Sequence, residues 1–427
     1  MRVWWLAAGC LVPLTLAAAA TASTTLGPAI VGPANLVAVD RAHQAGLAAN
    51  SRTYSATAVD YNRDGREDVW IGYHAQGAKL WKNKGNATYQ RVAAAAWPKV
   101  SAQGKQIDRH VCAWADVDHS GRPDAYCTTG RFTNNFVKVG RDNELWLQSR
   151  SGRFRDVGTA WGVGDVCGRG RFVTFIFANR DHFADLVLGN DAPRVVSDPC
   201  DSPANHLPNE RNKLYINTGG HGFRYAPKFW RPQPGTGSRC VQTLDFNRDG
   251  RQDLLTCGKV NQPLQLYQNM NGRRLVNVTS AHSLHSRVTD AVAADLNGDG
   301  RGDVVSSSSR GFAYHLNVNG LFQGAVRIGD SPVPRGVSVA AGDADGDGDI
   351  DVYGMVGAAK SNPDDVIWIN DNLTFSLLDV PSAGGRAAQV AALDPRGNGT
   401  SSFLALNGFG RGSDLLGPIQ LIRVTHR

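Results

Sequence analysis

The chain has 427 residues, and its 45 lysines and arginines outnumber its 38 aspartates and glutamates, which gives a formal net charge of +7. These basic residues are scattered and form no lysine- or arginine-rich run, so the composition argues against nucleic acid as a partner. Beyond the N-terminal region no segment reaches the roughly 18 consecutive apolar residues that a membrane-spanning helix requires, and no transmembrane segment is predicted.

The first residues are typical of a secretory signal. Arg2 supplies a positive charge, an apolar run follows, and Ala20-Thr-Ala22 is an Ala-x-Ala cleavage site. A lipoprotein signal ending at Cys10 is the alternative, but the apolar region in front of Cys10 would be incomplete. We therefore expect a secreted protein that consists of a signal peptide at 1–22, a short linker at 23–34 and a folded domain at 35–427.

A nine-residue pattern, Asp-x-Asp/Asn-x-Asp-Gly-x-x-Asp, recurs along the whole folded domain. It places oxygen-bearing side chains at positions 1, 3, 5 and 9 and a glycine at position 6. Five copies are complete and two have lost part of the set, and the spacing between copies is 48 to 68 residues. The complete copies begin at Asp60, Asp116, Asp245, Asp295 and Asp343, and the incomplete ones at Phe177 and Asp394. Seven repeats with this spacing indicate a repeat architecture.

Short loops of this kind are calcium cages, because Ca²⁺ prefers oxygen ligands and the glycine allows the sharp turn. A metal-free Asp-Gly turn is the alternative, but a turn needs only one aspartate and the glycine. An EF-hand would need flanking helices and a glutamate at position 12, whereas these flanks have β character. We expect about five structural calcium ions, with the residue at position 7 lending its backbone carbonyl. The predicted ligands are Asp60, Asn62, Asp64, Arg66, Asp68, Asp116, Asp118, Ser120, Arg122, Asp124, Asp245, Asn247, Asp249, Arg251, Asp253, Asp295, Asn297, Asp299, Arg301, Asp303, Asp343, Asp345, Asp347, Asp349 and Asp351.

Each repeat also contains short apolar runs that predict strands. One run precedes the aspartate loop, as at 54–59, and a second follows it, as at 69–71. A third carries a Leu-aromatic-x-Asn sequence, and a fourth follows in repeats one to six. Four short strands with turns between them describe a propeller blade. The last repeat lacks its fourth strand, so we expect 35–39 to complete it and close an all-β, seven-bladed β-propeller without a free sheet edge.

The order of these elements, with Lys79-Leu-Trp-Lys-Asn83 as one example of the third strand, resembles the FG-GAP/VCBS repeat. That repeat builds the propellers of integrin α-subunits, of cartilage-acidic-protein-like secreted proteins and of several lectins. The resemblance covers essentially the whole mature chain and implies the propeller fold and calcium. It does not specify a ligand, because members of the family range from adhesion modules to carbohydrate-binding and lyase domains.

Six cysteines remain after the signal, and an even number in an exported chain indicates disulfides. Four of them flank the second and fourth aspartate loops in the same register, which predicts two bridges between first and second strands. The remaining two would pair in blade three. A zinc site is disfavoured because no Cys-x-x-Cys spacing occurs. The predicted disulfides are Cys112–Cys127, Cys240–Cys257 and Cys167–Cys200.

Three insertions, at 130–142, 190–212 and 226–239, lie in connections that face away from the aspartate loops. Long loops on a rigid scaffold are the usual place for binding, although padding is the alternative. We expect a ligand to contact Trp230, Phe136 and Arg131 there, because aromatic faces stack on sugar rings and arginine donates directional hydrogen bonds.

The predicted function is a monomeric binding or adhesion module for a glycan or an extracellular surface protein. The alternative is a polysaccharide-active lyase or hydrolase on the same scaffold, and a purely structural module comes third. Neither a His-Glu-x-x-His nor a Gly-x-Ser-x-Gly motif is present, so an enzyme is not favoured. Four sequons, at Asn86, Asn277, Asn372 and Asn398, would carry glycans in a source that glycosylates.

Overall fold

The computed structural model describes residues 35–74, 77–93, 107–130, 142–165, 170–190, 212–232, 238–258, 262–284, 287–329, 335–357, 364–381, 383–409 and 416–427. The expected signal peptide and linker lie outside these ranges. Within them, helix is limited to α1 (Ala42–Ala45) and the 3₁₀ turn η4 (Thr279–Ala281). No helix in these ranges is long and apolar enough to cross a membrane.

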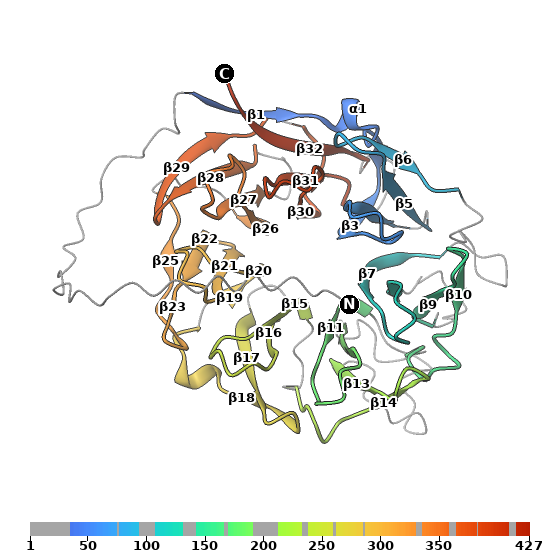
Figure 1. Ribbon diagram of the computed structural model, residues 1–427. Coiled ribbons are helices and arrows are strands. Elements are labelled where there is room, and N and C mark those ends of the chain that lie inside the picture. The colour runs from blue at the N-terminus through green and yellow to red at the C-terminus, as the bar shows by residue number, and fades with distance from the viewer. Residues whose placement is uncertain are drawn as a thin grey trace, which may run out of the picture.

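Seven antiparallel sheets are arranged radially around one axis (Figure 1). From the inner to the outer strand, blade one is β3 (Thr53–Val59), β4 (Asp68–Tyr73), β5 (Gly77–Asn83) and β6 (Tyr89–Arg91), and blade two is β7 (Arg109–Ala115), β8 (Asp124–Thr129), β9 (Glu144–Gln148) and β10 (Phe154–Asp156). Blade three is β11 (Gly170–Ile176), β12 (Asp185–Asn190), β13 (Lys213–Asn217) and β14 (Phe223–Tyr225), and blade four is β15 (Ser238–Leu244), β16 (Asp253–Gly258), β17 (Gln262–Met270) and β18 (Arg274–Asn277).

The remaining three blades follow the same order. Blade five is β20 (Asp290–Ala294), β21 (Asp303–Ser308), β22 (Gly311–His315) and β25 (Val326–Arg327), and blade six is β26 (Gly336–Gly342), β27 (Asp351–Val356), β28 (Val366–Asp371) and β29 (Thr374–Asp379). Blade seven is β30 (Gln389–Leu393), β31 (Ser402–Leu406), β32 (Gly417–His426) and β1 (Leu36–Asp40). The short strands β2 (Asn50–Ser51), β19 (Arg287–Val288), β23 (Asn317–Val318) and β24 (Leu321–Phe322) add local pairs. The prediction of an all-β, seven-bladed propeller is confirmed.

The first and last strands of the chain lie side by side in blade seven (Figure 1). Their antiparallel register pairs Leu36 with His426 and Asp40 with Ile422. Each innermost strand also packs against the innermost strand of the next blade, and β3 of blade one packs against β30 of blade seven. The first and last described strands therefore meet in one sheet.

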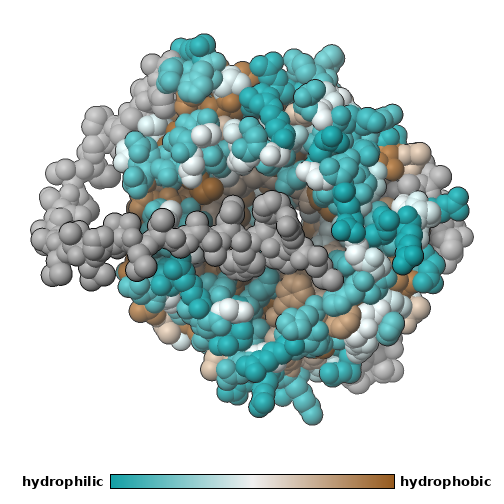
Figure 2. Space-filling view, in the orientation of Figure 1, coloured by the Kyte–Doolittle hydropathy of each residue, from teal (hydrophilic) through white to brown (hydrophobic). Residues whose placement is uncertain are grey.

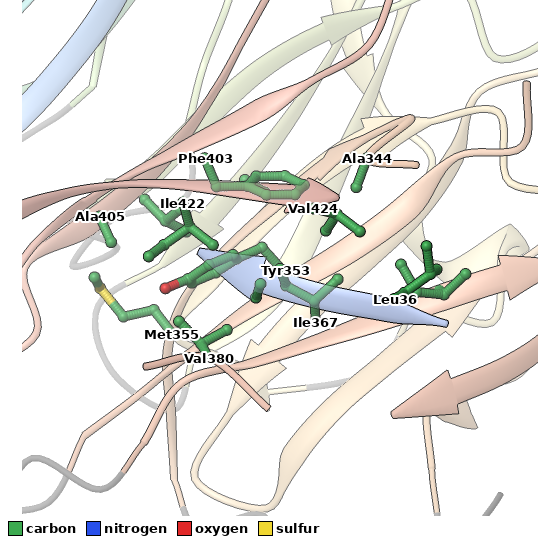
Figure 3. Packing of buried hydrophobic residues seen from close by; sticks show 14 of the residues in the cluster. Leu36, Ala344, Tyr353, Met355, Ile367, Val380, Phe403, Ala405, Ile422 and Val424 are labelled. Carbon is green, nitrogen blue, oxygen red and sulfur yellow. The ribbon is translucent and has the colours of Figure 1, made fainter. Parts of the chain in front are cut away.

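The core lies between neighbouring blades, and the second strands are its most deeply buried part. Every residue of β4, β8, β12, β27 and β31 is buried, because these strands are covered on both faces by adjacent sheets. Figure 3 shows one such cluster between blades six and seven, in which the rings of Tyr353 and Phe403 lie 5.1 Å apart and Leu36 of β1 lies toward the other end. Burying each large side chain of this kind contributes about 1.5–3 kcal/mol.

Two disulfides join first to second strands. Cys112 and Cys127 are directly paired in β7 and β8, with Cα atoms 4.1 Å apart. Cys240 and Cys257 occupy the equivalent position in β15 and β16, with Cα atoms 5.1 Å apart. Both predictions are confirmed, and the predicted Cys167–Cys200 pair lies outside the described residues.

Neighbouring blades are also linked by an asparagine that ends the third strand. Its side-chain amide donates a hydrogen bond to the backbone carbonyl of the second residue of the preceding blade's aspartate loop. In blades three to six these bonds are Asn217 to Val117 (2.9 Å), Asn269 to Ala178 (2.9 Å), Asn317 to Phe246 (2.8 Å) and Asn370 to Leu296 (2.8 Å). The Leu-aromatic-x-Asn sequence therefore has a role between blades as well as within its strand.

Candidate functional site

The five complete aspartate loops each connect a first strand to a second strand, so all five lie on one face of the propeller. In the first loop, the carboxylate of Asp60 accepts hydrogen bonds from the backbone amides of Asp64 at 3.0 Å and Gly65 at 2.8 Å. The same pair of bonds recurs in the loops that begin at Asp245 and Asp295. Gly65 has a φ of 81°, which explains why position 6 is glycine.

The aspartate at position 9 is fully buried in every complete loop and also has a role in strand pairing. One of its oxygens accepts the backbone amide at the end of the third strand, as in Asn83 to Asp68 at 2.7 Å. The incomplete third loop keeps this bond, from Asn217 to Asp185 at 2.8 Å. The sequence predicted only a metal-binding role for the aspartate at position 9. These bonds show that this aspartate also joins two strands, even in the third loop, where other predicted metal ligands are missing.

Burial and the neighbouring loop carboxylates raise the pKa of these position-9 groups. The pKa is about 7 for Asp68, Asp124, Asp253 and Asp351 and about 6 for Asp303, and desolvation is the largest cause in each. Negative charge is therefore concentrated at each loop, which is the electrostatic environment that a bound cation relieves.

Three oxygens at predicted ligand positions are buried without a hydrogen-bond partner. They are Oδ1 of Asn62 at position 3, Oδ1 of Asp116 at position 1 and Oδ2 of Asp253 at position 9. A buried acceptor without a partner is unfavourable and points to an absent ion or water. In the second loop, carboxylate oxygens of Asp116, Asp118 and Asp124 also lie within 4.8 Å of one another. An all-oxygen donor set of this kind fits calcium.

Basic side chains contact two of these loops. Lys82 Nζ lies 3.1 Å and Arg66 Nη1 3.5 Å from Asp64 Oδ2, and Arg251 bonds to Asp249 in the fourth loop. The two arginines occupy position 7, where the sequence predicted that the backbone carbonyl binds the ion. That role of the carbonyl stays a prediction.

On the opposite face, two histidines and an aspartate form a cluster that the sequence analysis did not find. His74 follows β4 in blade one, and Asp108 and His110 lie at the start of β7 in blade two. His74 Nδ1 is 3.3 Å from Asp108 Oδ1, and His110 Nε2 is 3.3 Å from Asp108 Oδ2. No motif connects these positions, because the arrangement of two blades brings them together.

Aromatic side chains surround this cluster. Tyr54 of β3 stacks on His110 with ring centroids 4.2 Å apart and meets His74 edge-on at 4.8 Å. Phe409 is 39% exposed and lies 5.8 Å from His74. Arg171, at the start of β11 in blade three, donates to the Tyr54 hydroxyl at 3.2 Å. The result is a partly open aromatic surface with cationic and anionic groups at its base.

The electrostatics of the cluster differ between its members. Burial lowers the pKa of His110, and the Arg171 charge lowers it further. Burial alone would raise the pKa of Asp108, but the adjacent His110 and His74 outweigh it and hold that pKa well below its usual range. Asp108 is therefore a carboxylate in a site with little solvent.

The predicted ligand residues are not brought together on a described surface. Trp230 is only 3% exposed and packs edge-on against Tyr267 at 5.5 Å, between blades three and four. Its indole has no free face for a sugar, so the assignment of Trp230 as a stacking residue is corrected: it anchors its loop to the core. Arg131 and Phe136 lie outside the described residues.

Comparison with known proteins identifies the repeat. The model of the FG-GAP-like repeat matches residues 60–127, 245–306 and 295–354. Two stretches of this β-propeller therefore match FG-GAP-like repeats. Among curated FG-GAP relatives, cartilage acidic protein 1 of Homo sapiens is 25% identical over 290 residues, which cover 62% of this chain and 39% of the relative. Cartilage acidic protein 1 of Xenopus tropicalis is 24% identical over 387 residues, which cover 73% of this chain and 58% of the relative.

The FG-GAP propeller therefore spans about two fifths of the human relative's length. Among solved structures it is similar to an Agrocybe aegerita lectin described as recognising non-reducing terminal N-acetylglucosamine. The TM-score is 0.52 at 18% identity, and the match covers 77% of this chain and 80% of the lectin. At this identity the similarity shows the shared fold. The two disulfides are consistent with an extracellular location.

Proposed function

We propose that this FG-GAP propeller is an extracellular binding module whose complete aspartate loops hold calcium. The observation that carries the calcium assignment is the set of buried, unpartnered oxygens of Asn62, Asp116 and Asp253, because all three occupy predicted ligand positions in different loops. Calcium would neutralise carboxylates that otherwise repel one another and would join the first and second strands of a blade. An ion that binds only the folded state stabilises it, by about 2.7 kcal/mol at a concentration 100 times its Kd.

Thermal melting in a calcium chelator and in excess calcium tests this assignment. Asp295→Asn and Asp394→Asn form a matched pair, since both carboxylates accept the backbone amides of loop positions 5 and 6. Only the loop of Asp295 has a complete ligand set. We expect Asp295→Asn to reduce the calcium-dependent rise in Tm, and Asp394→Asn to leave that rise unchanged. Superimposable wild-type melts in chelator and in calcium would overturn the assignment.

For the ligand we propose a glycan, bound on the face opposite the aspartate loops. The support is the partly exposed aromatic surface made by Tyr54 and Phe409, since aromatic faces stack on sugar rings. On the face shown in Figure 2, hydrophilic residues cover most of the described surface, and hydrophobic residues form small separate areas. The lectin with the same fold makes glycans the first class to screen, and an extracellular protein is the other candidate.

A glycan and polysaccharide binding screen in calcium, followed by variants, tests the location of the site. Phe409→Ala should weaken binding of the selected glycan about fivefold or more, because stacking is worth roughly 1–3 kcal/mol for a well-packed ring. Leu321→Ala is the control, because Leu321 is 53% exposed and belongs to the other face, in blade five. Equal affinity of Phe409→Ala and wild type would exclude this surface as the binding site.

A further inference from the structure

We propose that His74, Asp108 and His110 form a binding site for one divalent transition-metal ion, and that zinc fits it best. The site lies on the face opposite the aspartate loops, where blades one and two meet. It is separate from the calcium loops in position and in donor chemistry. Calcium prefers oxygen ligands alone, whereas imidazole nitrogen together with a carboxylate suits zinc and its first-row neighbours.

The hydrogen bonding of His110 supplies the first argument. Its Nδ1 lies 3.1 Å from the carbonyl oxygen of Gly170 and 3.4 Å from Arg171 Nη1. The contact with the carbonyl is the shorter one, and a proton on Nδ1 satisfies it, which leaves Nε2 to face Asp108. Its Nε2 is buried and lies 3.3 Å from Asp108 Oδ2, so the two atoms form an ion pair when Nε2 is protonated. Between these two atoms the site needs a cation, which is a proton when the site is free of metal and a metal ion when it is loaded.

The distances supply the second argument. Ligand atoms about 2.0–2.1 Å from a tetrahedral zinc lie roughly 3.3 Å from one another. His74 Nδ1 lies 3.3 Å from Oδ1 of Asp108, and His110 Nε2 lies 3.3 Å from Oδ2 of the same carboxylate. One ligand atom from each of the three residues falls within a 4.8 Å span, so a single ion can reach all three residues. The bond from His110 Nδ1 to a backbone carbonyl is also the usual support of a metal-binding histidine, since it fixes the ring and its tautomer.

Gly130, which follows β8, supplies the third argument. A Cβ atom at this position would lie 2.4 Å from Asp108 Oδ2 and 2.5 Å from His110 Nε2, so the absence of a side chain keeps the space beside both ligand atoms open. The backbone amide of Gly130 donates to the Asp108 carbonyl at 2.7 Å, which holds the glycine in place. Its φ is outside the left-handed region, so alanine could adopt the same backbone without strain.

The fourth coordination position would point toward solvent. The side chain of His74 is 23% exposed, whereas those of Asp108 and His110 are 10% and 3% exposed, so the cluster opens on the side of His74. Three protein ligands with one open position are the arrangement in which zinc can also bind a water molecule or an oxygen of a ligand.

Zinc titration of the wild-type protein, with the calcium loops kept saturated by excess calcium, tests the proposal. Isothermal calorimetry should show one zinc equivalent per chain, and cobalt(II) at the same site should give the visible absorption of tetrahedral coordination. His74→Ala should abolish both signals. Gly130→Ala, which retains all three ligands but displaces the carboxylate, should weaken zinc binding roughly tenfold or more.

His221→Ala is the matched control, because His221 is exposed in blade three and remote from the cluster. It should bind zinc as the wild type does, and the calcium-dependent melt of His74→Ala should match that of the wild type. The proposal would be overturned if the wild type does not bind zinc. It would also be overturned if His74→Ala and Gly130→Ala both bind zinc as the wild type does. The cluster would then be a hydrogen-bonded ion-pair network.

Discussion

Asn83 in blade one donates a hydrogen bond from Nδ2 to the carbonyl oxygen of Pro395 in blade seven, at 2.8 Å and across 312 residues of sequence. The same amide donates to the Glu67 carbonyl at 3.1 Å, and its Oδ1 accepts the amide of Gly85 at 2.9 Å. Asn83 is fully buried, and every hydrogen-bonding group of its side chain is satisfied. This bond is the equivalent, at the junction of the first and last repeats, of the links between blades three to six.

Asn83→Ala should therefore destabilise the propeller by about 2–4 kcal/mol, because it leaves the buried carbonyl of Pro395 and the partly buried carbonyl of Glu67 without these donors. Chemical denaturation measures the loss. Lys84→Ala, at an exposed lysine on the same hairpin, is the control and should change stability little. A loss in Asn83→Ala no larger than in the control would show that this bond does not hold blade one to blade seven.

Blade two lacks this link, since Gln148 stands where blades one and three to six have asparagine. The amide oxygen of Gln148 is buried without a partner. Gln148→Asn should allow a bond to the carbonyl of Tyr61, the equivalent residue of the preceding loop, and should raise stability by about 1 kcal/mol. A higher midpoint in chemical denaturation would bear this out, and a lower midpoint would show that the extra methylene is needed for packing.

The burial of Trp230 predicts a stability effect. Trp230→Ala should cost about 3–5 kcal/mol, because it opens a cavity between blades three and four. Trp230→Phe should cost much less, since the indole nitrogen has no hydrogen-bond partner to lose. Melting curves of the two variants check this. Wild-type stability in Trp230→Ala, together with weakened glycan binding, would restore the original role of Trp230 as a ligand contact.

The buried carboxyl of Asp365, at the start of the third strand of blade six, should make the stability of the fold depend on pH. Burial is the largest cause that raises its pKa to about 7, against 3.8 in an exposed carboxyl. Between about pH 4 and 7 the folded state therefore keeps a proton that the unfolded chain has released, so stability falls as the pH rises through this window. Asp365→Asn imitates the protonated form, and its Tm relative to wild type should rise from pH 4 to 7. A Tm difference that is constant with pH would contradict this assignment.

The sequence by itself determined the features that repeat locally. The seven loops, the four strands per blade and the two cross-strand disulfides all follow from patterns within about twenty residues, where turn chemistry and strand register fix which atoms meet. Cys112 and Cys127 could be paired because the positions of Cys240 and Cys257 around their own loop repeat the same register. The oxygen-rich loops were likewise visible as candidate calcium sites.

Only the tertiary structure decided what lies between blades. His74 and His110 come from different blades, and no spacing in the sequence encodes their approach. From the sequence, Trp230 was expected to be an exposed aromatic residue in a loop, but the packing of blades three and four buries it. Contacts of this kind depend on how whole sheets stack around the axis, and that arrangement is set by the shape of many buried side chains together rather than by any local pattern.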